Sequence, residues 1–349
     1  MKTSTINTFL ELLRCGLWQT DAALPEFDFG EVLQLSQEQS VIGLVAAGIE
    51  RAQGSSVAKE QVLQLAGIMV QIEQRNAAQN AFIAKIVDHL RSAGINAQLV
   101  KGQGIAQCYE RPEWRVSGDV DLFLESKDFG EAVDHMLSKA SSHKPLRRYS
   151  KELGLSVSRE YVELHGTLRT GLSGRVDKEI DAVQEDTFNY SRVRVWKDGD
   201  TDVLIPAADN DIIFVFTHFF KHFYKGGMNL RQLCDWCRLM WTYRNSIDPD
   251  FLEKHIRRMG LVYEWNSFAA LAVDHLGMPE SAMPLYTDAP EWHAKGDRLL
   301  RHILSGHRHS GVLSIARVFP LNTLRFLPAI LFNLNGLKVK ELLFGNACR

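Results

Sequence analysis

Residues 118–124 read Gly-Asp-Val-Asp-Leu-Phe-Leu, and this stretch decides the fold class. Acidic and apolar residues alternate in it, which is typical of a β-strand with two different faces. Side chains two apart on a strand share a face, so Asp119 and Asp121 project from the same side. Two neighbouring carboxylates favour a hard cation with oxygen ligands, such as Mg²⁺. The alternative is that both acids only keep a strand edge soluble.

The sequence around this strand predicts a small α+β core over residues 94–205. Strands are expected at 97–100, at 119–125 and over the longer alternating stretch 153–168, with a helix at 127–140. Residues 193–196 and 202–205 flank Lys-Asp-Gly-Asp, which indicates a hairpin. The order strand, helix, strand indicates a mixed sheet.

Helical regions are expected on both sides of this core. Leu, Ala, Gln and Glu recur at helical spacing in residues 1–93, and the pattern returns in residues 206–349. The expected helices cover 4–16, 30–51, 57–93, 209–224, 229–243, 249–259 and 261–276. The prediction is therefore a small mixed-sheet core between an N-terminal helical region and a C-terminal helical domain.

Composition excludes several classes of protein. The chain of 349 residues has 40 Lys and Arg against 42 Asp and Glu, for a net charge of −2, so no general attraction to nucleic acid is expected. Five scattered cysteines are a poor disulfide framework. The polar N-terminus and the short apolar segment 326–332 indicate neither a secretory signal nor a membrane span. We expect a cytoplasmic, soluble protein.

Two further stretches carry candidate site residues. Residues 99–104 (LVKGQG) end a strand in two glycines, where backbone N–H groups can approach phosphates, although an ordinary strand-to-helix turn fits equally. Residues 161–165 (YVELH) place Glu163 in a strand, and if that strand lies beside the first, Glu163 can become a third carboxylate. A solvent-facing Glu163 is the alternative, and Asp177 and Asp181 are its rivals.

The order of these motifs resembles the nucleotidyltransferase superfamily that includes DNA polymerase beta. More narrowly, it resembles the bacterial family of uncharacterised nucleotidyltransferases. Beyond the two aspartates, the resemblance rests on Lys101-Gly102, Arg115, residues 162–165, Pro206 with Asp209, Thr217-His218 and residues 229–235. It implies transfer of a nucleoside monophosphate from a triphosphate to an acceptor, with pyrophosphate leaving.

The resemblance also implies roles for individual residues. Asp119 and Asp121 would bridge two Mg²⁺ ions, with Mn²⁺ as a possible substitute, and Glu163 would complete the second ion's site. Gly102 and Gly104 would offer backbone N–H groups to the phosphates, and Lys101 or Arg115 would offset charge on the pyrophosphate. Gln103 departs from the small residue that the superfamily usually has there, so a larger side chain could crowd the phosphates.

Three functions follow from the sequence. The leading hypothesis is an enzyme that uses a nucleoside triphosphate and an unknown acceptor, whether a small molecule, a peptide or a protein. The alternative, motivated by Gln103, is an inactive nucleotide-binding or regulatory module of the same fold. RNA as the acceptor ranks lowest, and would rely on the tail from Arg301, with seven Lys or Arg against one acid. Cys234 and Cys237 are interpreted as packing residues, and His218 and His222 either as packing residues or as a polar link to the catalytic core.

Overall fold

The structure is a computed structural model that describes residues 2–53, 57–147, 151–188, 192–225, 227–305, 315–316 and 318–332. By its internal contacts the chain divides into two compact units. One unit comprises residues 66–169 and 178–214 and is called the core unit here. The other, the helical unit, comprises residues 1–65, 170–177 and 215–349.

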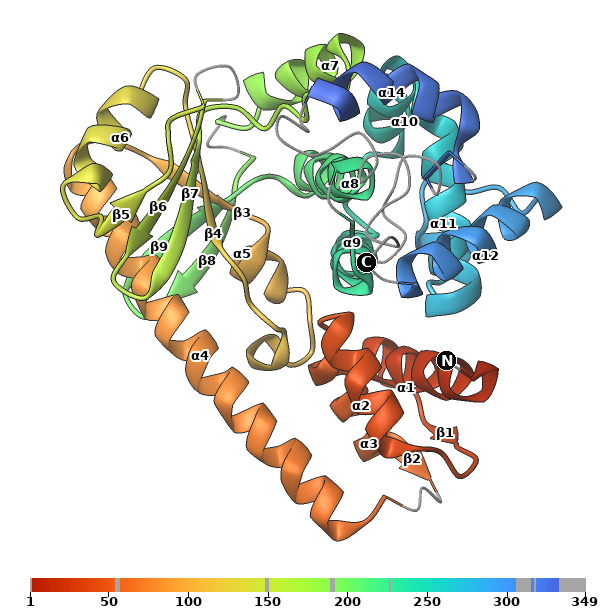
Figure 1. Ribbon diagram of the computed structural model, residues 1–349. Coiled ribbons are helices and arrows are strands. Elements are labelled where there is room, and N and C mark those ends of the chain that lie inside the picture. The colour runs from red at the N-terminus through yellow and green to blue at the C-terminus, as the bar shows by residue number, and fades with distance from the viewer. Residues whose placement is uncertain are drawn as a thin grey trace. The chain divides into compact units, whose positions relative to one another are not determined.

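In the described residues, the strands of the large sheet lie in the middle of the chain, between residues 97 and 205, with helices before and after them (Figure 1). The strands are β1 (Ala22–Ala23), β2 (Ala52–Gln53), β3 (Ala97–Val100), β4 (Val120–Leu124), β5 (Ser142–His143), β6 (Glu152–Val157), β7 (Glu160–His165), β8 (Arg194–Asp198) and β9 (Thr201–Ile205). The α-helices are α1 (Thr3–Trp18), α2 (Phe29–Glu38), α3 (Ile42–Arg51), α4 (Lys59–Ser92), α5 (Gly102–Ala106), α6 (Phe129–Leu137), α7 (Gly174–Glu185), α8 (Ala208–Lys225), α9 (Leu230–Tyr243), α10 (Pro249–Met259), α11 (Val262–Leu276), α12 (Pro290–Leu304) and α14 (Pro320–Phe332).

The core unit is built on a seven-stranded mixed sheet in the order β5-β6-β7-β4-β3-β9-β8. Strand β4 lies at its centre, antiparallel to β3 and parallel to β7. The predicted hairpin near residue 199 is present as β8 and β9, which pair antiparallel. This mixed sheet, with helices before and after it in the chain, confirms the predicted α+β class.

Each central strand buries one face in an apolar core, which explains its alternating sequence. Val120, Leu122 and Leu124 of β4 belong to one cluster with residues of α4 and α6, so both helices cover the same face of the sheet (Figure 1). Since side chains alternate across a strand, Asp121 and Phe123 project from the opposite face. The sheet therefore has an apolar face against helices and a second face that carries the acidic residues.

The alternating stretch 153–168 is β-structure, as predicted, but it is not a single strand. The structure forms the hairpin β6–β7 instead, with Leu155 paired to Val162 and Ser156 to Tyr161. Ser158 makes the reversal with a φ of 57°, a left-handed conformation that non-glycine residues rarely adopt. The turn residues, Ser-Arg, lack the Gly or Asn that usually announces a hairpin, which is why the sequence concealed it.

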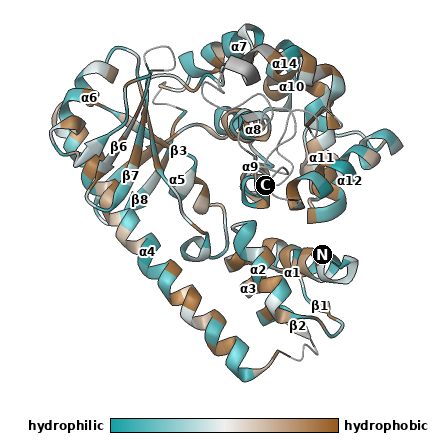
Figure 2. Cartoon of the chain, in the orientation of Figure 1, coloured by the Kyte–Doolittle hydropathy of each residue, from teal (hydrophilic) through white to brown (hydrophobic). Residues whose placement is uncertain are grey.

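The predicted long helix at 57–93 is confirmed as α4, which has 34 residues. Figure 2 shows hydrophobic and hydrophilic residues interspersed along it. Its polar side chains hold the segment that leads into β4. Asn76 Nδ2 donates to the carbonyls of Glu113 and Arg115 at 2.7 and 2.8 Å, and Gln79 Nε2 donates to that of Gly118 at 2.7 Å. Helix α4 therefore fixes where Asp121 enters the sheet.

The helical unit has its own close-packed core. In it, α1 and α3 approach at two glycines: a Cβ on Gly16 would lie 2.0 Å from the carbonyl oxygen of Leu44, and one on Gly48 would lie 2.1 Å from that of Leu12. Cys234 and Cys237 are fully buried, as expected of packing residues. The expected helix at 30–51 is two helices, α2 and α3, separated by Ser40, which has a φ of 56°.

The predicted domain boundaries at residues 93 and 205 remain a prediction. The two compact units divide the chain at other places, because most of α4 and the start of α8 belong to the core unit. Most of the basic tail beyond Arg301 lies outside the described residues. In the part of the chain that the structure describes, no helix combines the length and apolar character needed to cross a membrane.

Candidate functional site

Neighbouring strands bring two carboxylates and an imidazole together on the face of the sheet opposite α4 and α6. Asp121 of β4 pairs in register with Glu163 of the parallel strand β7. His165 lies two residues further along β7, so it shares the face of Glu163. One ligand atom from each of these three side chains lies within 4.8 Å of the others. We call Asp121, Glu163 and His165 the acidic cluster.

Asp121 is the most strongly held member of the acidic cluster. Its Oδ1 lies 2.7 Å from Lys101 Nζ and 2.9 Å from His165 Nε2. Burial alone would raise the pKa of Asp121, but the charge of Lys101 and the contacts with His165 outweigh it and hold that pKa far below its ordinary value. Asp121 is therefore ionised at neutral pH, although its side chain is only 11% exposed.

Glu163 has the opposite shift. Burial raises its pKa above the ordinary value, and the negative charge of Asp121 raises it further. Its Oε2 is 3.7 Å from His165 Nε2, too far for a hydrogen bond. The positive groups nearby thus compensate Asp121 well and Glu163 poorly. A second positive charge near Glu163 would lower the free energy of its ionised form.

An apolar wall adjoins the acidic cluster. Phe123 pairs in register with His165 and follows Asp121 on the same face. Its ring lies 5.0 Å from that of Phe188 and 6.3 Å from that of Phe214. Because these rings exclude water from one side, charges in the cluster interact more strongly than they would in bulk solvent.

The three acidic residues that the sequence analysis proposed as metal ligands do not all lie together in the structure. Asp121 and Glu163 meet as expected, whereas Asp119 lies directly before β4, is exposed to solvent and is not a member of the acidic cluster. The sequence analysis gave His165 no role. Its position two residues after Glu163 on the same strand face was the signal that could have found it.

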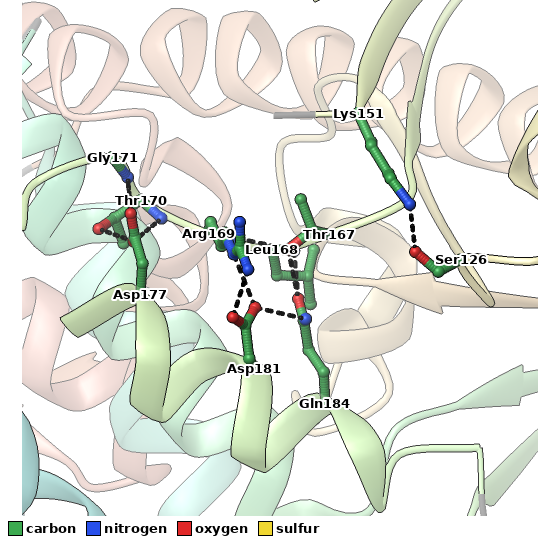
Figure 3. Close-up of polar contacts among 10 residues, drawn as sticks. All are labelled: Ser126, Lys151, Thr167, Leu168, Arg169, Thr170, Gly171, Asp177, Asp181 and Gln184. Atoms are coloured by element: carbon green, nitrogen blue, oxygen red, sulfur yellow. Dashed lines mark hydrogen bonds and ion pairs between the residues drawn. The ribbon is translucent and has the colours of Figure 1, made fainter. Parts of the chain in front are cut away.

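The two rivals of Glu163 hold the chain after β7 instead (Figure 3). Asp181 Oδ1 accepts a hydrogen bond from Arg169 Nε at 2.7 Å, and Asp177 accepts from the backbone N–H of Thr170 at 2.8 Å. Gln184, also on α7, accepts from the Thr167 hydroxyl at 3.1 Å. Both aspartates therefore have structural partners, which leaves Glu163 as the second carboxylate of the cluster.

The glycine turn connects β3 to the short helix α5. Lys101 has a φ of 61° and Gly102 a φ of 47°, so two consecutive residues are in left-handed backbone conformations. The N–H of Gly104 donates to the carbonyl of Lys101 at 3.0 Å and is already used within the turn. Val100, just before this turn, pairs with Asp121, so the turn begins beside the acidic cluster.

The side chain of Gln103 points toward α4. It is buried, and its Nε2 donates to Asn76 Oδ1 at 2.8 Å and to Gln79 Oε1 at 3.2 Å, both on α4. The bulk that could have crowded a phosphate therefore packs against α4. Arg115 is also buried, at 7% exposure, and its predicted contact with pyrophosphate stays a prediction.

We expect Gln103→Ser, which restores the small residue usual in the superfamily, to destabilise the core unit without improving nucleotide binding. The change leaves Asn76 and Gln79 with buried oxygens that have lost a donor, at a cost of about 1–3 kcal/mol. Thermal unfolding and nucleotide titration of the same preparation measure both effects. A stable variant that binds nucleotide at least tenfold tighter would show that Gln103 does obstruct the phosphates.

A known protein family matches most of this chain. The sequence profile of a family described as "Uncharacterised nucleotidyltransferase" matches residues 25–277. No curated protein gives a significant match. A solved structure, of an antigenic nucleotidyltransferase-like protein from Paracoccidioides brasiliensis, is similar over 57% of this chain and 92% of its own, with 10% identity and a TM-score of 0.33. The profile covers well over half of the chain, which therefore belongs to the uncharacterised nucleotidyltransferase family.

Proposed function

We propose that this protein is a metal-dependent nucleotidyltransferase that moves a nucleoside monophosphate from a triphosphate to an acceptor hydroxyl or similar group. Membership of the family supports the reaction class. The observation that carries the proposal is the pairing of Asp121 with Glu163 on adjacent parallel strands, with His165 beside them. A cluster of carboxylates on neighbouring strands supplies the oxygen ligands that such a metal-dependent reaction needs.

The donor groups fit a divalent cation. Nearby positive groups neutralise the charge of Asp121 but not that of Glu163, so an additional positive charge between the two is favoured. Carboxylate oxygens are the ligands that Mg²⁺ and Mn²⁺ prefer. Asp121 and Glu163 would hold the ion, and the exposed Asp119 would add a carboxylate for a second one. When bound, the metal neutralises charge on the phosphates and on the attacking oxygen. His165 contacts Asp121 at 2.9 Å and would orient its carboxylate.

The chain's own residues would then position the reactants. The acceptor hydroxyl gives up its proton to solvent, and its oxygen forms a bond to the α-phosphorus. The bond from that phosphorus to the β-phosphate's bridging oxygen breaks, and pyrophosphate leaves with both electrons of that bond. Lys101 reaches the cluster from the glycine turn and would contact the phosphates. Catalysis of this kind consists mainly of positioning and electrostatic stabilisation.

Pyrophosphate release tests the proposal directly. The full chain is incubated with each of the four nucleoside triphosphates, Mg²⁺ or Mn²⁺, and acceptor pools of small molecules, peptides and proteins. We expect release that needs both a metal and an acceptor. Thermal stabilisation by nucleotide with no release under any condition would favour the inactive binding module. Neither stabilisation nor release would contradict both functions.

A further inference from the structure

Lys101 occupies an unusual backbone position for a lysine. Its φ of 61° and ψ of −152° lie in a region that side chains other than glycine rarely adopt. Such strain persists only where the surroundings enforce it, and it gathers at functional sites. Here the carbonyl of Lys101 accepts from the N–H groups of Gly104 and Ile105 at 3.0 and 3.3 Å. The turn thus fixes the direction in which the lysine side chain leaves the backbone.

That direction brings the ammonium group to Asp121. Lys101 Nζ is 2.7 Å from Asp121 Oδ1, and both side chains are largely buried, at 15% and 11% exposure. His165 contacts the same oxygen. A divalent cation bound by Asp121 would therefore lie within a few ångströms of an ammonium group, in a site that is only weakly screened by water. Lys101 and the metal compete for one carboxylate.

A triphosphate would remove this competition. A lysine is a compact charge on a flexible stem, so its ammonium can exchange one anionic partner for another while its backbone stays fixed. Lys101 stands at the start of the glycine turn, where the proposed function places the phosphates. Once the ammonium group turns to a phosphate oxygen, Asp121 becomes available to the metal, and the repulsion between the two cations is offset by the phosphate charge.

We infer that Lys101 couples metal binding to triphosphate binding, by leaving Asp121 for the phosphates when the nucleotide arrives. The inference rests on the proposed function and adds an order to it: the metal binds weakly alone and strongly with the triphosphate. Coupling between two ligands is reciprocal, so metal must strengthen triphosphate binding by the same factor.

Binding measurements with Mn²⁺ and a non-hydrolysable ATP analogue test the coupling. Electron paramagnetic resonance gives free Mn²⁺, and titrations of the full chain are corrected for the Mn²⁺–analogue complex in solution. For wild type we expect the analogue to strengthen Mn²⁺ binding by at least about tenfold, a coupling of about 1.4 kcal/mol. Lys101→Met should bind Mn²⁺ alone about tenfold tighter, and its coupling should fall below about threefold.

Controls separate charge from structure. Lys101→Arg keeps the positive charge and should retain coupling, and Lys139→Met removes an exposed lysine of the core unit and should behave as wild type. Lys101→Gly removes the charge while suiting the backbone, so it replaces Lys101→Met should that variant fail to fold. Suppose that wild type binds both Mn²⁺ and the analogue, but that removing the charge of Lys101 changes neither the Mn²⁺ affinity nor the coupling. That result would overturn the inference and leave the proposed function intact. Wild type that binds neither ligand would overturn the proposed function as well.

Discussion

Replacement of Asp121 with asparagine is expected to reduce metal-dependent pyrophosphate release by at least about 10³-fold, equivalent to about 4 kcal/mol of transition-state stabilisation. Asp121 is the central residue of the acidic cluster, and its low pKa keeps it charged at neutral pH. Asparagine preserves the shape but removes the charge that a divalent cation needs. Steady-state assays at saturating triphosphate and several Mg²⁺ concentrations measure the loss.

A matched control is available in the same unit. Asp134 is an exposed acid on α6, a helix that covers the opposite face of the sheet, and Asp134→Asn should leave pyrophosphate release unchanged. Asp119→Asn should fall between these two variants, because Asp119 is near Asp121 in sequence but outside the cluster. Equal activity in wild type and Asp121→Asn would show that the carboxylate has no catalytic role.

The second large effect is that replacing Asp121 and replacing Glu163 change the stability of the protein in opposite directions. In protein treated with a chelator, we expect Asp121→Asn to lower the free energy of unfolding by about 1.5–3 kcal/mol, since it breaks charge-assisted contacts with Lys101 and His165. Glu163→Gln should instead raise the unfolding midpoint by about 1–3 °C, because the pKa of Glu163 is raised and its charged form is disfavoured. Both variants should lose turnover.

The pH dependence of stability identifies the ionisable group that causes each of these two effects. The pKa of Asp121 is depressed, so its stabilising contribution is present above the unfolded value of about 3.9 and is lost as pH falls through the folded value. The pKa of Glu163 is raised, so the advantage of glutamine over glutamate grows as pH rises through the folded value and vanishes near pH 4. Melting curves from about pH 2 to pH 8 cover both windows and check this. A Glu163→Gln variant less stable than wild type at pH 8 would contradict the described electrostatics.

Local patterns made much of the fold predictable. The strand at 97–100, the helix at 249–259 and the hairpin near Gly199 each follow from a periodicity or a turn signal within a few residues. The β6–β7 reversal could not be predicted, since Ser158 adopts a left-handed conformation that is rare for its residue type. Likewise, Ser40 divides α2 from α3 with no glycine or proline to mark the break.

The site was only partly predictable for a related reason. Alternation placed Asp121 and Glu163 on faces that could meet, and strand order then determined that they do. The contact of His165 with Asp121, the burial of Gln103 against α4 and the pairing of Asp181 with Arg169 all depend on which elements become neighbours. Residue spacing contains no information on such contacts between distant segments.

Direct observation of the metal tests the central claim. Crystals of the full chain soaked with Mn²⁺ and a non-hydrolysable triphosphate analogue would be measured at a wavelength where manganese scatters anomalously. We expect an anomalous peak within about 2.5 Å of carboxylate oxygens of both Asp121 and Glu163, with the triphosphate on the side of Lys101 and Gly102. A bound triphosphate with manganese elsewhere, or full Mn²⁺ occupancy that persists in Asp121→Asn crystals, would contradict the account.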